Sequence, residues 1–398
     1  MTLPRMLFFL VFFTRWGLMH VWVGRRLIAQ GSEYSPRTRR SIWVAVAALG
    51  ILPLLGFFGR RLGLVGGLLD SLQWLGFICM GLSSLLISFT MVVDLSRLLL
   101  AAGRKLADRR RGESADTAMD PARRRFFADV ANYGIVGGAA GLSAVGFGLA
   151  RRVPAVVEIE VPIADLHPDL VGFRIAQLSD VHIGPTIHGA WLEKVVAATN
   201  AAGPDLVALT GDFVDGHVAE LGPELEALSR LEARHGAFFV TGNHEYYWDG
   251  PAWCRFVASL GPTVLCNEHR LIEHGEARLL VAGVTDLHAD RNEPSHRSDP
   301  AAAKAGAPAH DVSLLLAHQP RSVFAAAEVG FDLQLSGHTH AGQYFPMSLL
   351  IHLMQPYVSG LNRHGDMQIY VSRGTGYWGP PNRAGSPSEI TLLTLVRA

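Results

Sequence analysis

Two long runs without a charged residue constrain this chain more than any other feature of its sequence. Residues 41–58 form an uncharged run of 18 residues, and residues 72–93 form a second uncharged run of similar length. About 20 apolar residues in a helix cross the hydrocarbon core of a bilayer. Because helices satisfy their backbone hydrogen bonds internally, they suit that environment. We therefore predict two transmembrane helices.

Two other apolar runs allow more than one interpretation. Residues 6–24 contain Arg15 and His20, so they predict either a third span or a helix lying in the membrane interface. Residues 133–150 follow the sequence RRRFF at 123–127. This pattern resembles a twin-arginine export signal, or it is simply the basic flank of another span.

These runs predict four segments. We expect a membrane region with two to three transmembrane helices at 1–102, a basic cytoplasmic loop at 103–125, a further transmembrane or twin-arginine-like segment at 126–152, and a folded domain at 153–398.

Charge is divided unevenly between the two parts of the chain. Residues 1–152 hold 20 Lys and Arg against 8 Asp and Glu, whereas residues 153–398 hold 15 against 27 and 16 of the 17 histidines. The positive-inside rule places the basic stretches 25–40 and 103–125 in the cytoplasm, which puts the region after 151 outside. The acidic second part argues against a nucleic-acid-binding surface.

Polar residues follow several apolar runs of strand length in the second part. The run VGFRIAQL at 171–178 leads into Asp180 and His182, whose side chains fall on one side of an extended backbone. Four comparable clusters follow: GDFVD at 211–215, GNHE at 242–245, AHQP at 317–320 and GHTH at 337–340. In α/β sheets the carboxyl ends of strands meet at one crevice, so we expect one site.

The residue types in these clusters indicate metal chemistry. Carboxylates, an amide and imidazoles are the mixture expected for two divalent ions rather than for a thiolate zinc site. Burial of so many ionisable groups without an opposing charge would be costly, which disfavours a purely structural role for the set. Asp215, Glu245 and Thr339 are individually compatible with capping or bracing their turns.

The ordered set D-x-H, GD-x-x-D, GNHE, a single histidine in LLLAHQP, and GHTH resembles the calcineurin-like metallophosphoesterases over about residues 170–398. The segments LSDVHIG, LSGHTHAGQYFP and YVSRGTGYWGPPNR, with SEIT, resemble the bacterial membrane-anchored branch of that superfamily. That branch usually has a second glycine after GHTH, where this chain has Ala341.

The resemblance implies a fold and a location. It implies a four-layer α-β-β-α sandwich preceded by an α-helical transmembrane region. It also implies a multi-pass protein of the bacterial inner membrane, with the catalytic domain outside the cytoplasm.

The resemblance also implies roles for individual residues. Asp180, His182 and His340 would hold one divalent ion, Asn243, His318 and His338 the other, and Asp212 would bridge them. The ions would be Mn, Fe or Zn. His244 would contact the phosphate or protonate the leaving oxygen. The implied activity is hydrolysis of phosphoesters, foremost phosphodiesters, by metal-activated water without a covalent intermediate.

Two alternatives to this function remain open from the sequence. One is a hydrolase of lipid-linked pyrophosphates at the membrane surface, and the other is a catalytically silent binding protein on the same fold. Arg373, in a glycine-rich stretch, is a candidate phosphate contact. The apolar residues 345–354 predict either a lipid-facing lip or, preferably, a buried helix or cover of the sheet. Residues 219–234 predict a helix, and residues 286–311 predict an exposed loop.

Overall fold

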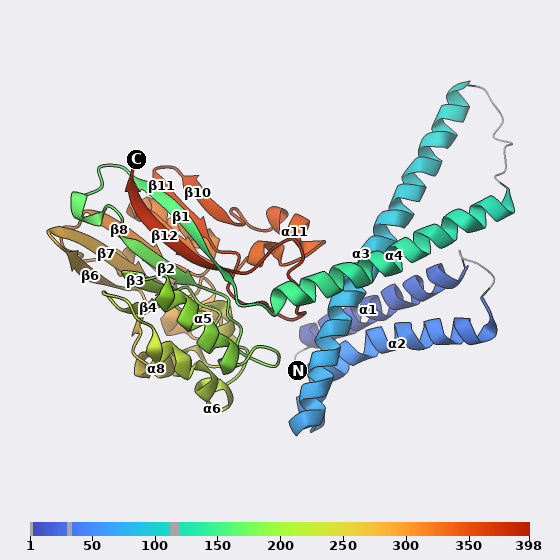
Figure 1. Ribbon diagram of the computed structural model, residues 1–398, viewed down its shortest axis with the longest axis horizontal. Coiled ribbons are helices and arrows are strands. Elements are labelled where there is room, and N and C mark those ends of the chain that lie inside the picture. Colours follow the sequence, from blue (N-terminus) through green and yellow to red (C-terminus); the bar gives the residue numbers. More distant parts are fainter. Residues whose placement is uncertain (1–2, 30–33, 112–119) are drawn as a thin grey trace. The chain divides into compact units, whose positions relative to one another are not determined.

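The computed structural model describes residues 3–29, 34–111 and 120–398. The chain divides into two compact units, Met1–Val145 and Gly146–Ala398. Figure 1 shows that the first unit is built from helices and that the second contains the strands. Each unit is described by itself below.

The first unit consists of long helices. They are α1 (Leu3–Ala29), α2 (Pro36–Phe58), the short 3-10 helix η1 (Gly59–Leu62), α3 (Gly66–Arg111) and α4 (Pro121–Ala150), which continues into the second unit. Ser35 caps α2 by accepting a hydrogen bond from the backbone of Thr38 at 3.1 Å. Three of these helices are long and apolar enough to cross a membrane: α2, α3 over Gly66–Ala107, and α4. The predicted spans 41–58 and 72–93 lie in α2 and α3, and residues 6–24 lie in α1.

The basic stretch 103–125 differs from the predicted loop. Residues 103–111 continue α3 without a break, and residues 121–125 already belong to α4. Residues 112–119 lie outside the described part of the chain. Lys, Arg, Ala and Leu are all good helix formers, so a run of charge does not by itself end a helix.

The second unit contains two six-stranded sheets. The first has the order β1-β12-β2-β3-β4-β5, and the second has the order β10-β11-β9-β8-β7-β6. Neighbouring strands are parallel except at β12–β2, β10–β11 and β6–β7. The strands are β1 (Ala155–Ile163), β2 (Arg174–Leu178), β3 (Leu206–Leu209), β4 (Ala237–Phe239), β5 (Thr263–Val264), β6 (Glu268–His274), β7 (Ala277–Gly283), β8 (Val312–Leu316), β9 (Leu333–Ser336), β10 (Gly360–His364), β11 (Met367–Val371) and β12 (Glu389–Arg397).

Short helices connect these strands. The α-helices are α5 (Gly189–Ala201), α6 (Val218–Leu221), α7 (Asn243–Tyr247), α8 (Gly250–Ser259), α9 (Pro300–Lys304), α10 (Val323–Val329) and α11 (Met347–Leu350). The 3-10 helices are η2 (Pro168–Leu170), η3 (Gly222–Arg230), η4 (Ala289–Arg291), η5 (Pro294–His296), η6 (Pro320–Ser322), η7 (His340–Gly342) and η8 (Ile351–Leu353).

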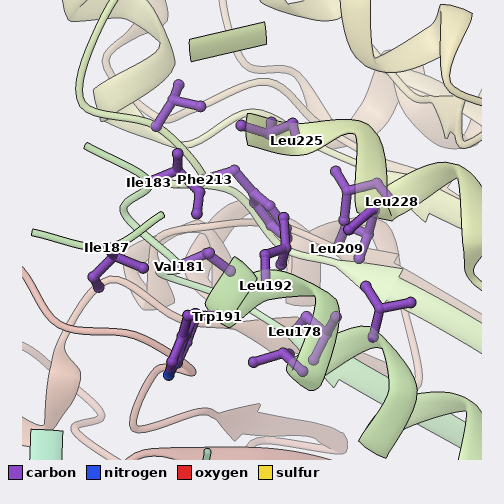
Figure 2. Close-up of a cluster of buried hydrophobic side chains, with 14 of the residues drawn as sticks. Leu178, Val181, Ile183, Ile187, Trp191, Leu192, Leu209, Phe213, Leu225 and Leu228 are labelled. Atoms are coloured by element: carbon purple, nitrogen blue, oxygen red, sulfur yellow. The ribbon is translucent and has the colours of Figure 1, made fainter. Parts of the chain in front are cut away.

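Three apolar cores define the layers of the second unit. The central core joins side chains from both sheets, such as Ile175 of β2 and Leu314 of β8. An outer core packs the first sheet against α5 and η3, where Trp191 and Leu192 face Leu178 and Leu209 (Figure 2). A third core packs the second sheet against α9 and α10. The predicted α-β-β-α sandwich is therefore confirmed.

Three local predictions about the second unit were wrong. Residues 219–234 were expected to form one helix, but α6 gives way to the 3-10 helix η3 at Gly222-Pro223, since proline cannot donate the next helical hydrogen bond. Residues 286–311 contain η4, η5 and α9, with Ala289 and Ala303 buried, and are not a wholly exposed loop.

The third concerns residues 345–354. They form α11 and η8, but their large apolar side chains are mostly exposed. The preferred interpretation as a buried helix is therefore wrong. An apolar run indicates that exposure of its side chains to water is unfavourable. It does not indicate whether the protein itself covers those side chains.

Candidate metal centre

The predicted polar residues lie together at the ends of strands. Asp180 follows β2, Asp212 follows β3, His318 follows β8 and His338 follows β9. Their possible ligand atoms fall within 4.8 Å of one another in three groups: Asp180 with His182 and His340, His182 with Asp212 and His244, and Asp212 with His318 and His338. His182 and Asp212 each belong to two of these groups, and the middle group that they share joins the two ends of the cluster.

The backbone at this cluster is strained. Five of the predicted ligands have a positive φ: Asp180 (54°), His182 (54°), Asp212 (57°), His338 (71°) and His340 (49°). A residue with a Cβ adopts this left-handed region at a cost of roughly 1–2 kcal/mol. Such strain gathers at functional sites, where the surrounding fold enforces it in order to aim side chains.

The two aspartates are held by backbone amides. The amide of His338 donates to both carboxylate oxygens of Asp180 at 3.0 Å, and the amide of His244 donates to Asp212 Oδ1 at 2.8 Å. A Cβ on Gly337 would lie 2.2 Å from Asp180 Oδ2, and one on Gly242 would lie 2.2 Å from Asp212 Oδ1. Only glycine permits these close approaches.

Glu245 braces the turns that carry these residues. Its carboxylate accepts hydrogen bonds from the backbone amides of Gly242 at 2.6 Å, Phe213 at 2.7 Å and Asp212 at 3.0 Å. Burial and the nearby charge of Asp212 raise the pKa of Glu245 to about 6. Its contacts are those of a structural brace, one of the two roles that the sequence allowed.

The histidines His318 and His338 direct ring nitrogens into the cluster. His318 Nδ1 donates to the carbonyl of Thr210 at 2.8 Å, so its Nε2 faces Asp212 Oδ2 at 3.1 Å and His338 Nδ1 at 3.2 Å. Burial and the charge of His318 lower the pKa of His338 to about 4. His338 is therefore neutral at pH 7, and neutral imidazole is the form that binds a cation.

Asn243 provides the observation that tests whether a cation fits. Its side-chain oxygen is buried and has no hydrogen-bond partner among the described residues. Its amide nitrogen donates to the hydroxyl of Tyr247 at 3.2 Å. A buried oxygen without a donor is costly, and a bound cation would satisfy it. The donor set therefore fits a metal ion.

The other end of the cluster contains Asp180, His182 and His340. His340 Nε2 lies 3.3 Å from Asp180 Oδ1 and 3.2 Å from His182 Nε2. Burial, followed by the charges of Arg383 and His182, lowers the pKa of His340 well below its usual value. The carboxylate and the two imidazoles converge, as the two histidines and Asp212 do at the opposite end.

The guanidinium of Arg383, which sequence reasoning missed, lies behind His340. It is fully buried and donates to His340 Nδ1 at 2.8 Å, to the carbonyl of Arg373 at 2.7 Å and to that of Gly376. The only sequence signal was its place in the closing segment PPNR. These contacts fix the orientation of the His340 ring.

Asp215 connects two of the site histidines. Its carboxylate oxygens lie 2.5 Å from His244 Nδ1 and 3.2 Å from His182 Nδ1. Burial would raise the pKa of Asp215, but the two histidines hold it at about 2. Burial would also lower the pKa of His244, but Asp212 and Asp215 raise it to about 9. His244 is therefore a protonated imidazole at neutral pH, able to donate a proton.

Comparison with known proteins agrees with this geometry. The family model described as calcineurin-like phosphoesterase matches residues 173–342. A zebrafish (Danio rerio) "transmembrane protein with metallophosphoesterase domain" is 34% identical over 393 residues, which cover 96% of this chain and 87% of the relative. The chain belongs to the calcineurin-like phosphoesterase family. It is thus a member of a metal-dependent hydrolase family and, with its candidate spans, a membrane protein.

Other relatives of this phosphoesterase occur in animals and bacteria. A bovine (Bos taurus) protein of the same description is 38% identical over 268 residues, covering 65% of this chain and 60% of the relative. An uncharacterised metallophosphoesterase of Helicobacter pylori is 39% identical over 251 residues, covering 63% of this chain and 65% of the relative. Resemblance is therefore not confined to the bacterial branch.

A cavity of about 250 Å³ adjoins the metal-binding cluster of the phosphoesterase. Asn243 and His338 form part of its wall. Its other lining residues include His288, Arg291, Arg321 and Gln355, none of which sequence reasoning selected. His288 belongs to the segment 286–311, and its side chain is half-buried.

Arg373 is not among the residues that line this cavity. Its side chain is 45% exposed, and its Nε lies 3.9 Å from the carboxylate of Glu389. The structure therefore brings together the seven predicted ligands and His244 but not Arg373. Cationic side chains near the cavity come from Arg291 and Arg321 instead.

Proposed function

We propose that this chain is a membrane-anchored phosphoesterase with a dinuclear metal centre, which hydrolyses phosphodiester bonds. The observation that carries the proposal is the double membership of Asp212, which shares one group of ligand atoms with His182 and another with His318 and His338. A carboxylate in that position can contact two cations at once.

These groups, together with the unpartnered oxygen of Asn243, support the ligand assignment that the family resemblance implies. Asp180, His182 and His340 would hold one ion, and Asn243, His318 and His338 the other, with Asp212 between them. The nitrogen and oxygen donors suit Mn, Fe or Zn. When bound, two such cations supply positive charge for an anionic ester and lower the pKa of water.

The protein's own contribution to the reaction centres on His244. Its raised pKa keeps the imidazole protonated near pH 7, and Asp215 orients the ring through Nδ1. A protonated imidazole at this position donates a hydrogen bond to the ester and then a proton to the leaving oxygen. The cluster needs no serine or cysteine nucleophile.

The orientation in the membrane is part of the same proposal. We expect the phosphoesterase domain, residues 153–398, to lie outside the cytoplasm of a bacterial cell. The basic stretches 25–40 and 103–125 support this arrangement through the positive-inside rule. A reporter enzyme fused after Ala398 that is active only outside the cytoplasm would agree, and cytoplasmic activity would contradict the orientation.

Hydrolysis by the full chain tests the enzymatic proposal. The chain in lipid nanodiscs is loaded with Mn²⁺, Fe²⁺ or Zn²⁺ and given bis(p-nitrophenyl) phosphate. Asp212→Ala should lower kcat/KM by about 10³-fold, and His244→Ala by about 10²-fold or more. Asp249→Asn is the matched control, because Asp249 is an exposed N-cap of α8 that accepts from the amide of Ala252. Absence of hydrolysis with every metal, or equal rates in all variants, would overturn the proposal.

A further inference from the structure

An exposed apolar surface lies in the segment that follows the last predicted metal ligands. We call it the apolar rim: Met347, Leu349, Leu350, Leu353 and Met354, which are 42%, 64%, 44%, 86% and 55% exposed. Residues 344–354 contain no Asp, Glu, Lys or Arg. A cluster of large apolar side chains in contact with water is unfavourable and marks a surface that something covers.

The apolar rim is a folded element. The amide of Ser348 donates to the carbonyl of Tyr344 at 3.0 Å, and that of Leu350 donates to Pro346 at 3.2 Å. Ile351 is only 8% exposed and anchors the segment from beneath. The rim side chains are therefore held outward by the backbone, and their exposure is built into the fold.

The apolar rim is joined directly to the metal centre and its cavity. It begins a few residues after His340, in the segment that opens with η7. At its other end, the guanidinium of Arg321 donates to the carbonyl of Met354 at 2.8 Å. Arg321 lines the cavity beside Asn243 and His338, and so does Gln355, the residue that follows Met354. An apolar surface and a polar cavity thus share one boundary.

The chain itself indicates what covers the apolar rim. The candidate membrane span α4 ends at Ala150, and only residues 151–154 separate it from β1. The last turn of α4 belongs to the second unit, where Ala150 is buried in a core and the carbonyl of Gly146 accepts from the amide of Arg383 at 3.0 Å. With no long linker, the phosphoesterase domain is held at the surface of a bilayer.

We propose that the apolar rim inserts into the acyl region of that bilayer and that the substrate is a membrane lipid with a phosphodiester headgroup. The lipid's anionic headgroup enters the cavity, where Arg291 and Arg321 supply positive charge, and its acyl chains remain beside the rim. An uncharged apolar surface matches acyl chains, and an arginine at its edge matches a phosphate. The substrate class rests on the proposed hydrolase function, whereas the insertion does not.

Insertion is measured without reference to activity. A nitroxide is attached at Leu353→Cys in the full chain, with the three native cysteines replaced by alanine, in nanodiscs of phosphatidylcholine and phosphatidylglycerol. The label should collide more often with dissolved oxygen than with a water-soluble nickel complex. Val171→Cys is the matched control. Val171 is also an exposed apolar residue, at 48%, but it precedes β2, whereas the predicted ligand Asp180 follows that strand. The two residues therefore lie at opposite ends of β2. A label at 353 that is as accessible to nickel as the label at 171 would overturn the insertion.

The substrate class is tested with two esters that share one leaving group. The lipid probe is a diacylglycerol p-nitrophenyl phosphate in the nanodisc, and the soluble probe is bis(p-nitrophenyl) phosphate. Leu349→Ser combined with Leu353→Ser should lower hydrolysis of the lipid probe about tenfold and change hydrolysis of the soluble probe less than about twofold. Val171→Ser should change neither rate.

The outcomes separate the two proposals. An equal loss of hydrolysis rate with both probes would overturn the lipid-substrate proposal. The rim side chains would then contribute to folding and not to recognition of the lipid. Unchanged rates on both probes would also overturn it and favour a protein partner or a second copy of the chain on this surface. If the unaltered chain hydrolyses neither probe with any metal, the proposed hydrolase function fails, while the nitroxide measurement still decides the insertion.

Discussion

Each unit of this protein buries one cluster of charged and polar side chains, and the two clusters differ in how they are satisfied. In the helical unit, Arg26 donates from Nε to Asp94 at 2.7 Å and from Nη1 to Asn132 at 2.5 Å. Asn132 in turn donates to the carbonyl of Leu27 at 3.2 Å. These contacts tie α1 to α3 and α4, and the two charges offset each other.

The cluster in the phosphoesterase unit is compensated only in part. Asp212 lies 3.1 Å from His318 and Asp215 lies 2.5 Å from His244, but other polar atoms of the cluster face no opposite partner. Imidazole nitrogens of His318 and His338 face each other at 3.2 Å, and the buried oxygen of Asn243 has no partner in the described part of the chain. The cluster collects atoms that donate electron pairs, and a cation is the group that satisfies them. A buried cluster in which opposite charges and hydrogen-bond partners satisfy each other therefore indicates a structural role. A buried cluster in which several electron-pair donors converge indicates a site for a cation.

Removing one partner of the helical cluster should cause the largest change in stability. Asp94→Ala leaves the buried guanidinium of Arg26 without its counter-charge, which costs about 3 kcal/mol or more. We expect a lower melting temperature of the full chain in detergent micelles. Arg26→Met combined with Asp94→Leu should restore most of the loss, because apolar residues of similar size replace such pairs without penalty.

Activity measurements show whether this contrast holds. Once corrected for the folded fraction, hydrolysis of bis(p-nitrophenyl) phosphate by Asp94→Ala should equal that of the unaltered chain. A large loss of activity at unchanged stability would show that the Arg26 cluster is functional and would break the comparison.

Asp215→Asn should reduce activity with little effect on the fold. The substitution keeps the shape of the side chain but removes the charge that orients His244 and His182. Loss of a group that orients a ligand or catalytic histidine lowers activity about 10- to 100-fold. Steady-state kinetics should place the loss mainly in kcat. The melting temperature serves as the control, and a loss explained entirely by unfolding would assign Asp215 to the scaffold.

Ala341→Gly should produce the smallest effect, on stability alone. Ala341 has φ +48° and ψ 33°, in the left-handed region that glycine adopts freely. Relief of this strain should stabilise the domain by about 1 kcal/mol, measured as a higher melting temperature. Ala341 adjoins His340, one of the predicted ligands with the same left-handed backbone, so its strain belongs to the turn that carries the site. Destabilisation by the glycine would contradict this account.

Local patterns in the sequence predicted an α/β domain with one polar site, and the family resemblance implied the layered fold and the ligand assignment. Apolar runs of strand length ending at Asp180, Asp212 and His338 required their ends to meet, and glycines such as Gly337 marked the close approaches. The uncharged runs predicted α2 and α3 for an equally local reason: apolar length is visible along the chain.

Features that depend on contacts distant in sequence were not predictable in this way. Arg383 lies 43 residues from His340, and Arg321 lies 33 residues from Met354, whose carbonyl accepts its hydrogen bond. The run 345–354 was misread because exposure depends on the neighbours of a segment and not on its own composition. Asp215 was recognised as a residue to weigh, but its two histidine partners appear only in three dimensions.

The number of metal ions bound by the folded chain tests the central claim most directly. After treatment with a chelator and dialysis against Mn²⁺ or Zn²⁺, elemental analysis of the full chain should give two equivalents per chain. Asp212→Ala should retain fewer, because it removes the carboxylate proposed to lie between the two ions, whereas Asp249→Asn should retain both. Loss of one ion or of both ions in Asp212→Ala would agree with the account. No bound metal in the unaltered chain, or the same content in Asp212→Ala, would contradict it.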